Sequence, residues 1–417
     1  MFWRRLRDRI VDLVRPPVDE PASSQQSRRR VRITVPVPLR QRPREFRVVH
    51  EEAVIHEETS LRARILGRTA RLVFKPLLNL APLNDRSLTL MRSLDARAAK
   101  GPRSRFVEPV AFELGGVHVE SMTHRYGPTS AMTVLYLHGG GFFSCGIETH
   151  RRICERLALY TGGTVVSVEY TQLPDGPVAA SVADAIAAYE GLLEIAEDPT
   201  KIVVAGDSAG GYLTMKVAEL ATRRGLQQPA ALLGFSPLLS LDPDHEKEQV
   251  KRVTRVRDAY LPMRRVGLIR ERWLPEGSQI EGEDSPLDAA DHIDSPTFLV
   301  GVEDEMLRPE IEAMALLLSE RGVPVETHLW RGQVHAFPVM VDAIPESREA
   351  LRLAADFARR AVGEAAERAS DDSGRHEEPL EGEVVEEPTT SADDEVIDVE
   401  LETSGRDRRR RWFFQAS

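Results

Sequence analysis

Residues Lys201–Leu220 read KIVVAGDSAGGYLTMKVAEL and join three local patterns. The β-branched run Ile202–Val204 predicts a buried strand, and apolar residues recur after the glycines at the spacing of one helical face. Between them stands Gly-Asp-Ser-Ala-Gly, with Ser208 at its centre. The two flanking glycines allow a tight reversal, because a Cβ there would collide with the returning chain. The stretch therefore predicts a strand, a sharp turn that exposes the Ser208 hydroxyl, and a helix.

Glycine and serine are also ordinary turn residues, so this motif needs support from the rest of the chain. The chain has 417 residues, of which 41% are hydrophobic, enough to bury the core of one large domain or of two. Residues 371–402 hold fourteen acidic residues against one arginine. This tail carries more negative charge than the net −11 of the whole chain, so the acidic balance describes the tail and not the body.

The cysteine content indicates a reducing compartment. Cys145 and Cys154 are the two cysteines, and their spacing matches no zinc or redox motif. We interpret both as small buried residues, and we expect a cytoplasmic protein. No apolar run approaches the roughly 20 residues that cross a bilayer, and the N-terminus lacks the apolar core of a secretory signal.

Both ends of the chain combine basic with apolar or aromatic residues. Phe2, Leu6, Ile10 and Leu13 recur at helical spacing among arginines, and residues 406–414 read RDRRRRWFF. One hypothesis is peripheral contact of these ends with the inner face of an anionic membrane. The alternative is two solvated ends. We predict four parts: a basic segment and linker at 1–50, N-terminal cap helices at 51–105, a catalytic domain at 106–365 with a cap insert at about 240–275, and a disordered tail at 366–417.

The body of the chain alternates between predicted strands and helices. A hairpin is expected over residues 106–123, and helices over 60–75 and 87–100. The later strands are expected at residues 133–137, 164–169, 202–205, 231–235, 297–302 and 325–329, and the helices between them at 149–160, 178–196, 209–224 and 309–321. This alternation predicts an α/β fold with a mostly parallel sheet covered by helices on both faces. Reactive groups are then expected at the carboxyl ends of the strands.

A second motif follows one of these strands. His138-Gly139-Gly140-Gly141 leaves backbone N–H groups uncovered, and such a loop can bind a developing oxyanion. Phosphate binding is the rival interpretation, but the Gly-Lys-Ser/Thr of a phosphate-binding loop is absent here. A simple structural turn is the third alternative.

Three motifs together resemble the hormone-sensitive-lipase-like branch of the α/β-hydrolases. They are HGGG at 138–141, GDSAGG at 206–211, and residues 169–177, a variant of D-Y-R-L-A-P-E-x-P. The resemblance spans about residues 87–357. It implies an α/β-hydrolase fold with a helical cap, and an oxyanion hole formed by the N–H groups of Gly140, Gly141 and Ala209. It also implies that His138 and Gly139 support the loop.

A nucleophilic serine needs a base and an acid, in the chain order Ser, acid, His. Among the later histidines we choose His335, because it follows the last predicted strand while the others lie in charged segments, in a strand or in the tail. His335 also matches the H-x-F motif of the resembling family. For the acid, the same resemblance favours Asp304 over Glu303 in the turn after residues 297–302. A metal site formed by this acidic turn and His335 would leave the serine motif unexplained.

These residues predict a serine hydrolase that cleaves carboxylic esters through an acyl-enzyme, with no metal or organic cofactor. By analogy with the resembling family we expect small-molecule esters with short to medium acyl chains, lipid-derived esters among them, and we expect no nucleic-acid partner. Leucines of the N-terminal helices, such as Leu77, Leu80 and Leu90, are candidates to line the acyl site or to pack in the core. The oligomeric state is not predicted. Two other functions stay open: a non-catalytic small-molecule receptor of the same fold, and an amide or carbamate hydrolase that uses the same residues.

Overall fold

The computed structural model describes residues 28–33, 51–80, 82–98, 104–241, 258–259, 261 and 266–375. The chain divides into two compact units, Met1–Ser373 and Gly374–Ser417. Of the second unit only residues 374 and 375 are described, as the end of a helix. The fold and the candidate site belong to the first unit. The two chain ends for which we considered membrane contact, residues 2–13 and 406–414, lie outside the described residues. Most of the acidic tail, from residue 376 on, also lies outside them.

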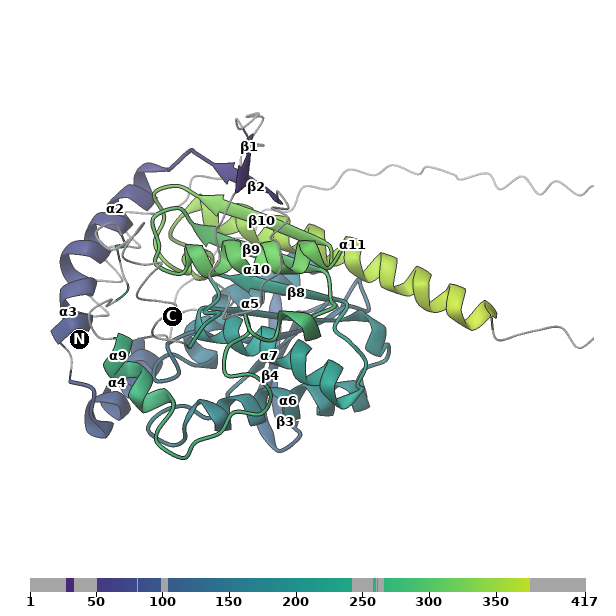
Figure 1. The fold of residues 1–417 in the computed structure, drawn as a ribbon, viewed down its shortest axis with the longest axis horizontal. Coiled ribbons are helices and arrows are strands. Elements are labelled where there is room, and N and C mark those ends of the chain that lie inside the picture. Colours follow the sequence, from purple (N-terminus) through teal and green to yellow (C-terminus); the bar gives the residue numbers. More distant parts are fainter. Residues whose placement is uncertain are drawn as a thin grey trace, which may run out of the picture. The chain divides into compact units, whose positions relative to one another are not determined.

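Within the described residues, ten strands form one sheet in the order β1-β2-β10-β9-β8-β7-β5-β6-β4-β3 (Figure 1). The strands from β2 to β6 in this order run parallel, and antiparallel pairs close both edges. Their bounds are β1 Arg28–Ile33, β2 Glu51–His56, β3 Val107–Leu114, β4 Val117–His124, β5 Thr133–Leu137, β6 Thr164–Val168, β7 Ile202–Asp207, β8 Ala231–Phe235, β9 Thr297–Val302 and β10 Val325–Trp330.

The central strands are apolar on both faces, as a sheet covered on both sides requires. In β7 all six residues are buried; Val204 faces one hydrophobic cluster and Val203 the other. Helices α6, α7 and α10 contribute to the first cluster, and α5 and α11 to the second. The helices are α2 Leu61–Thr69, α3 Lys75–Leu80, α4 Asp85–Ala98, α5 Ile147–Thr161, α6 Val178–Ile195, α7 Ala209–Arg224, α9 Val266–Trp273, α10 Arg308–Glu320 and α11 Pro345–Arg375.

Four helices lie apart from those that cover the sheet centre. In Figure 1, α2 and α3 run along the left of the view, with α4 and α9 below them. A π-helical turn, Ala70–Phe74, joins α2 to α3. The Arg272 guanidinium at the end of α9 donates to the Leu83 carbonyl at 3.0 Å and pairs with Asp85, so α9 is fixed to the start of α4. These helices lie within residues 51–105 and about 240–275, where the sequence predicts the cap, and their role as a cap stays a prediction. Among the described helices, none is long and apolar enough to span a membrane.

The prediction of a mostly parallel α/β sheet is confirmed, and the expected strands and helices occur at the expected places. Two strands were not predicted. β2 pairs parallel with β10, and β1, which lies in the predicted linker, pairs antiparallel with β2. The polar run EEAVIH of β2 gives little strand signal, because half of its residues are charged or histidine. At the other end α11 continues to Arg375, ten residues beyond the predicted domain boundary at 365.

Candidate active site

Ser208 stands at the turn between β7 and α7. Its backbone lies at φ 51° and ψ −117°, a conformation that a residue with a side chain rarely adopts. The turn is this tight because the flanking glycines touch the neighbouring chain. A Cβ on Gly206 would lie 2.4 Å from the Gly210 carbonyl oxygen, and one on Gly210 would lie 1.9 Å from that of Leu137. The predicted sharp turn is therefore present, with Ser208 at its apex.

His335 follows β10, and its side chain reaches the serine. Its Nε2 lies 2.8 Å from the Ser208 Oγ, so the two form a hydrogen bond. The next residue, Ala336, adopts a left-handed conformation at φ 52° and donates its N–H to Ser236 Oγ at 3.2 Å. This turn holds the His335 imidazole, whose side chain is 3% exposed, beside Ser208 at the end of β7.

The carboxylate that contacts His335 belongs to Glu305. Its Oε2 lies 2.8 Å from His335 Nδ1, and its Oε1 accepts the Val302 N–H at 2.8 Å. Both oxygens are thus engaged, and the side chain is 1% exposed. Because β9 and β10 are neighbours with Val302 opposite Trp330, the turn after each strand can meet the other. Ser208, His335 and Glu305 form one continuous hydrogen-bonded chain.

This geometry corrects the prediction of Asp304 as the acid. Asp304 is half-buried and its charge acts on Arg331, whose pKa it helps to raise after the larger effect of Glu303. Glu303, the second choice, pairs with the same guanidinium at 2.5 and 3.0 Å. The turn after β9 folds Glu305 back onto the Val302 N–H, whereas Glu303 pairs with the exposed Arg331. One sequence feature could have favoured Glu305: it directly precedes the apolar residues Met306 and Leu307, which are buried in the structure.

The glycine loop after β5 lies beside this chain, because β5 and β7 are neighbouring strands with Leu137 opposite Gly206. Gly140 has φ 122°, and a Cβ on it would lie 1.9 Å from the Ser144 carbonyl oxygen, so only glycine fits there. Within the described residues, the N–H groups of Gly140 and Gly141 donate no hydrogen bond. The N–H of Ala209, the first residue of α7, likewise lacks an intrahelical acceptor.

Asp207 joins the serine turn to the glycine loop. Its Oδ1 accepts the Gly139 N–H at 3.0 Å and the Tyr136 hydroxyl at 2.8 Å, and His150 Nε2 lies 3.2 Å from the same oxygen. Burial pushes the pKa of the Asp207 carboxyl up, but His150 and these hydrogen bonds outweigh it and hold the pKa below its ordinary value. The carboxylate is therefore charged, and it fixes the position of Gly139 relative to Ser208.

His138 lies in the support of this loop. Its ring stacks on Tyr170 with centroids 4.3 Å apart, and its Nδ1 lies 2.8 Å from the Gly139 carbonyl oxygen. The Tyr170 hydroxyl donates to the His138 carbonyl at 2.6 Å. Burial lowers the pKa of His138 despite the nearby Glu169 carboxylate, so the ring is neutral at pH 7. The stacked, neutral ring fits a supporting position without direct contact to Ser208.

Trp273 also contacts the loop, and no sequence pattern predicted this contact. The indole Nε1 of this last residue of α9 donates to the Gly141 carbonyl at 2.8 Å. Its ring meets Phe142 edge to face, with centroids 5.6 Å apart. Phe142 is fully buried and has φ 61°. A helix distant in the sequence is therefore attached to the glycine loop that lies beside Ser208.

The His335 imidazole has a shifted pKa. Burial alone would lower the pKa, but the hydrogen bond and charge of Glu305, with smaller contributions from Asp258 and Asp207, raise it above its ordinary value. A buried imidazole with a carboxylate on Nδ1 is stabilised in its protonated form. It can accept a proton through Nε2 when it is neutral, and Ser208 Oγ lies at that nitrogen.

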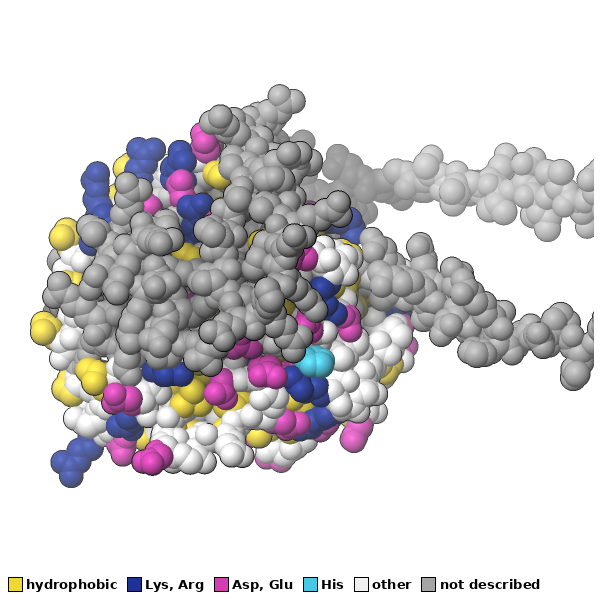
Figure 2. Space-filling model, viewed as in Figure 1, with side chains coloured by type: hydrophobic (Ala, Val, Ile, Leu, Met, Phe, Trp, Pro, Cys, Tyr) yellow, Lys and Arg dark blue, Asp and Glu magenta, His cyan; other side chains and the backbone are white. Residues whose placement is uncertain are grey.

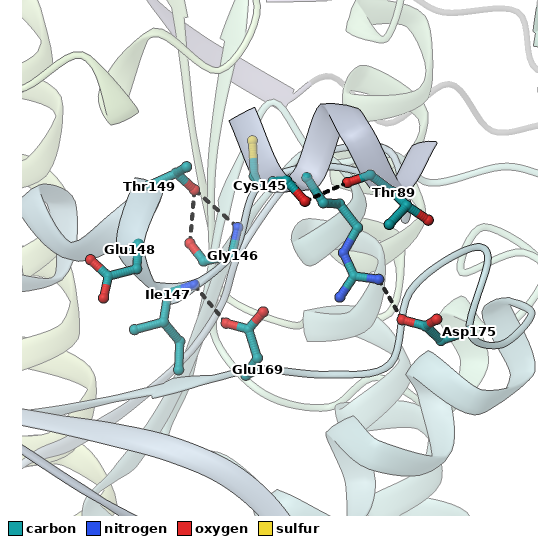
Figure 3. Close-up of a pocket in the computed structure, with 10 residues that line it drawn as sticks. Thr89, Cys145, Gly146, Ile147, Glu148, Thr149, Glu169 and Asp175 are labelled. Atoms are coloured by element: carbon teal, nitrogen blue, oxygen red, sulfur yellow. Dashed lines mark hydrogen bonds and ion pairs between the residues drawn. The ribbon is translucent and has the colours of Figure 1, made fainter. Parts of the chain in front are cut away.

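A cavity of about 370 Å³ is lined by Cys145 and Gly146, which follow the glycine loop in the chain (Figure 3). Its walls come from α4, the start of α5 and the residues after β6. The polar groups of the walls contact one another: Glu169 accepts the Ile147 N–H at 2.9 Å (Figure 3), and Arg92 of α4 pairs with Asp175 at 2.5 Å. Ser208 and His335 do not line this cavity. Glu169, which replaces the aspartate of the resembling family, thus caps α5 and does not face the serine.

Comparison with known proteins identifies the class that this fold and site define. Residues 134–339 match the family described as alpha/beta hydrolase fold. Esterase LipU of Mycobacterium tuberculosis is 34% identical over 236 residues, 55% of this chain and 78% of that protein. The carboxylesterase/phospholipase LipF of the same species is 32% identical over 237 residues, 55% of this chain and 62% of that protein.

Solved structures agree with these relatives. A hormone-sensitive lipase from a metagenome library superimposes with a TM-score of 0.61 at 26% identity, covering 73% of this chain and all of that one. The chain belongs to the α/β-hydrolase fold family, in its hormone-sensitive-lipase-like branch. It is an enzyme of the esterase and lipase type.

Proposed function

We propose that Ser208, His335 and Glu305 form the catalytic triad of an enzyme that hydrolyses carboxylic esters. The observation that carries the proposal is the pair of 2.8 Å hydrogen bonds that joins Glu305 to His335 and His335 to Ser208. His335 Nε2 takes the hydroxyl proton as Ser208 Oγ attacks the ester carbonyl. Glu305 holds the imidazole in the tautomer with the proton on Nδ1 and stabilises the imidazolium that forms.

The oxyanion of the tetrahedral intermediate then needs donors. The N–H groups of Gly140, Gly141 and Ala209 fit this role, since they lack other acceptors within the described residues and lie on the two loops that flank Ser208. Each such donor lowers the barrier by about 3 kcal/mol in measured cases. His335 returns its proton to the leaving alcohol, which leaves Ser208 acylated. Water, deprotonated by the same imidazole, then releases the acid and frees the serine.

The substrate is a small ester, and we propose acyl chains of short to medium length, with lipid-derived esters among them. The names of the two mycobacterial relatives, an esterase and a carboxylesterase/phospholipase, support ester chemistry. Acyl chain length is left to experiment, because only residues 258, 259 and 261 are described between residue 241 and α9. We further propose that the enzyme acts in the cytoplasm, which agrees with its two free cysteines.

A fluorophosphonate probe tests this proposal directly, because it labels a serine only where a base and an oxyanion hole activate it. We expect one labelled peptide, the one that contains Ser208. Hydrolysis of p-nitrophenyl butyrate should fall in step with labelling and be lost when labelling is complete. Ser208→Ala should lose both signals. Ser319→Ala, on α10, serves as the matched control and should keep both. Label on another serine, or activity retained in Ser208→Ala, would overturn the assignment.

A further inference from the structure

The segment from α2 to α3, residues 61–80, is basic throughout. It holds four arginines and Lys75 and contains no aspartate or glutamate. Arg64, Arg68 and Arg71 are exposed. A continuous helical segment with five positive charges and no negative one carries a local field opposite in sign to the net charge of the whole chain.

The same segment exposes its large apolar residues. The exposed fractions are 70% for Leu61, 52% for Ile65, 75% for Leu72, 48% for Leu77 and 81% for Leu80. Its buried residues are two alanines, Ala63 and Ala70. A helix of a soluble domain normally does the reverse, since it buries its leucines and faces water with polar groups. Figure 2 shows hydrophobic and basic side chains together along the side of the molecule where α2 and α3 run.

The exposed apolar residues share a face. Leu61, Ile65 and Leu72 are separated by four and seven residues, which places them on one side of a helix. The π-helical turn at Ala70–Phe74 takes in one extra residue, and this rotates α3 so that Leu80 returns toward that side. Exposed contiguous apolar surface with basic residues beside it is the arrangement of helices that lie in the surface of a membrane.

We propose that the α2–α3 segment, residues 61–80, docks this enzyme on the surface of an anionic phospholipid bilayer. Its leucines and isoleucine enter the boundary between headgroups and acyl chains, and its exposed arginines contact lipid phosphates. This surface lies on described helices of the cap and is distinct from the two chain ends. The proposal does not depend on which residues carry out the hydrolysis.

Charge complementarity selects the bilayer over a second copy of the chain. A symmetric dimer through this face would bring two identical basic segments together, and like charges in an interface oppose association. An anionic lipid surface supplies the opposite sign over the whole length of the segment. The acidic residues at 371–402 of this chain are the remaining competitor, and the experiment includes them as an outcome.

Co-sedimentation of the full chain with vesicles tests the proposal. We expect binding to vesicles of equal phosphatidylglycerol and phosphatidylcholine, weaker binding to phosphatidylcholine alone, and a decrease with salt. Ile65→Asp with Leu72→Asp should weaken the partition at least about tenfold, because it removes apolar contact and adds negative charge. Arg64→Glu with Arg68→Glu should weaken it by a similar factor.

Matched controls separate the segment from the rest of the surface. Ile195→Asp changes an isoleucine of comparable exposure, 61%, at the end of α6, and Arg125→Glu makes the same charge change beyond β4. Both should bind like the wild type. A wild type that does not sediment, or segment variants that sediment like the controls, would overturn the proposal. A shift from dimer to monomer in the segment variants without a change in sedimentation would instead assign this face to a second copy.

Depth of insertion gives an independent measurement. Leu72→Trp should show stronger fluorescence quenching than the wild type when the phosphatidylglycerol carries brominated acyl chains, and Ile195→Trp should show no increase. If vesicle binding rises only after removal of residues 376–417 and stays independent of Leu72 and Ile65, the acidic tail or another face is responsible and the proposal fails. We expect each variant to fold, because all of the changed side chains are exposed. Circular dichroism checks the folding of each one.

Discussion

Glu305 and His335 are joined by a hydrogen bond of 2.8 Å between the carboxylate Oε2 and the imidazole Nδ1, and both side chains are buried. The two residues follow neighbouring parallel strands, β9 and β10. Glutamate is one methylene longer than aspartate, so a turn that begins at the end of β9 can still deliver a carboxylate to a ring held over Ser208. This geometry identifies Glu305 as the acid of the proposed triad. The sequence order of the three adjacent carboxylates, residues 303–305, does not identify it.

The first prediction concerns this pair. Glu305→Gln should lower kcat by about 10³- to 10⁴-fold, because the amide cannot stabilise the imidazolium and can hold the wrong tautomer. KM should change little, since the side chain does not reach the acyl group. The measurement is steady-state hydrolysis of p-nitrophenyl butyrate. Asp304→Asn removes a neighbouring carboxylate and should leave kcat within about threefold; a collapse in that variant, with Glu305→Gln active, would reassign the acid.

The pH dependence follows from the raised pKa of His335. The imidazole must be neutral to accept the serine proton, so kcat/KM should fall on the acid side through a pKa above the ordinary histidine value of about 6.5. In Glu305→Gln the main group that raises the pKa of His335 is gone, while burial still lowers this pKa. The acid limb of the residual activity should therefore move to lower pH. An unchanged limb would show that another group controls the profile.

The sequence predicted most of the scaffold because its signals were local. Alternating β and α patterns located the central strands, and the glycines around Ser208 and at 138–141 marked the two loops by their steric requirements. Which carboxylate reaches His335 depends on the path of the turn between Val302 and Met306. That path is set by tertiary packing. If the turn were shifted by one residue along the sequence, a different carboxylate would face His335.

The contact of Trp273 with the glycine loop could not be predicted from the sequence for a different reason. Its indole meets Gly141 across 132 positions of chain, and such a contact leaves no periodic pattern. β2 was missed likewise, because its polar sequence becomes a strand through pairing with β10, where His56 Nε2 lies 2.9 Å from His328 Nδ1. Both features depend on contacts between residues far apart in the sequence, and local propensity does not reveal such contacts.

Trp273 gives a prediction about the oxyanion loop. Trp273→Phe keeps an aromatic ring against Phe142 but loses the hydrogen bond to the Gly141 carbonyl. We expect kcat to fall about tenfold with little change in KM, since the glycine loop that carries the proposed donors becomes less fixed. A boronic acid that mimics the tetrahedral intermediate should bind correspondingly more weakly. Trp330→Phe is the control: the Trp330 indole N–H has no acceptor within the described residues, so binding of the boronic acid should persist.

Asp207 gives a prediction that couples stability with activity. Its Oδ1 accepts both the Gly139 N–H and the Tyr136 hydroxyl, and its Oδ2 lies 3.3 Å from His150 Nε2, so the N–H₂ of an asparagine replaces one of these acceptor oxygens. Asp207→Asn should lower the free energy of unfolding by about 1–3 kcal/mol and reduce kcat, because a buried donor loses its acceptor and the glycine loop loosens. Urea titration with parallel kinetics measures both. Asp184→Asn, which affects one hydrogen bond from the Thr171 N–H, should destabilise less and leave kcat unchanged.

Lys216 gives the last prediction, which concerns stability alone. Its ammonium is buried in α7, pairs with Glu219 at 2.5 Å and donates to the carbonyls of Glu281 and Glu283 at 2.7 Å. Burial lowers the pKa of Lys216, but these partners keep the charge satisfied. Lys216→Met should lower the free energy of unfolding by about 3–5 kcal/mol, because it leaves the Glu219 carboxylate buried with one cation fewer. The paired change with Glu219→Gln should recover part of that loss in urea titrations. Full additivity of the two single losses would show that the ion pair does not act as a unit.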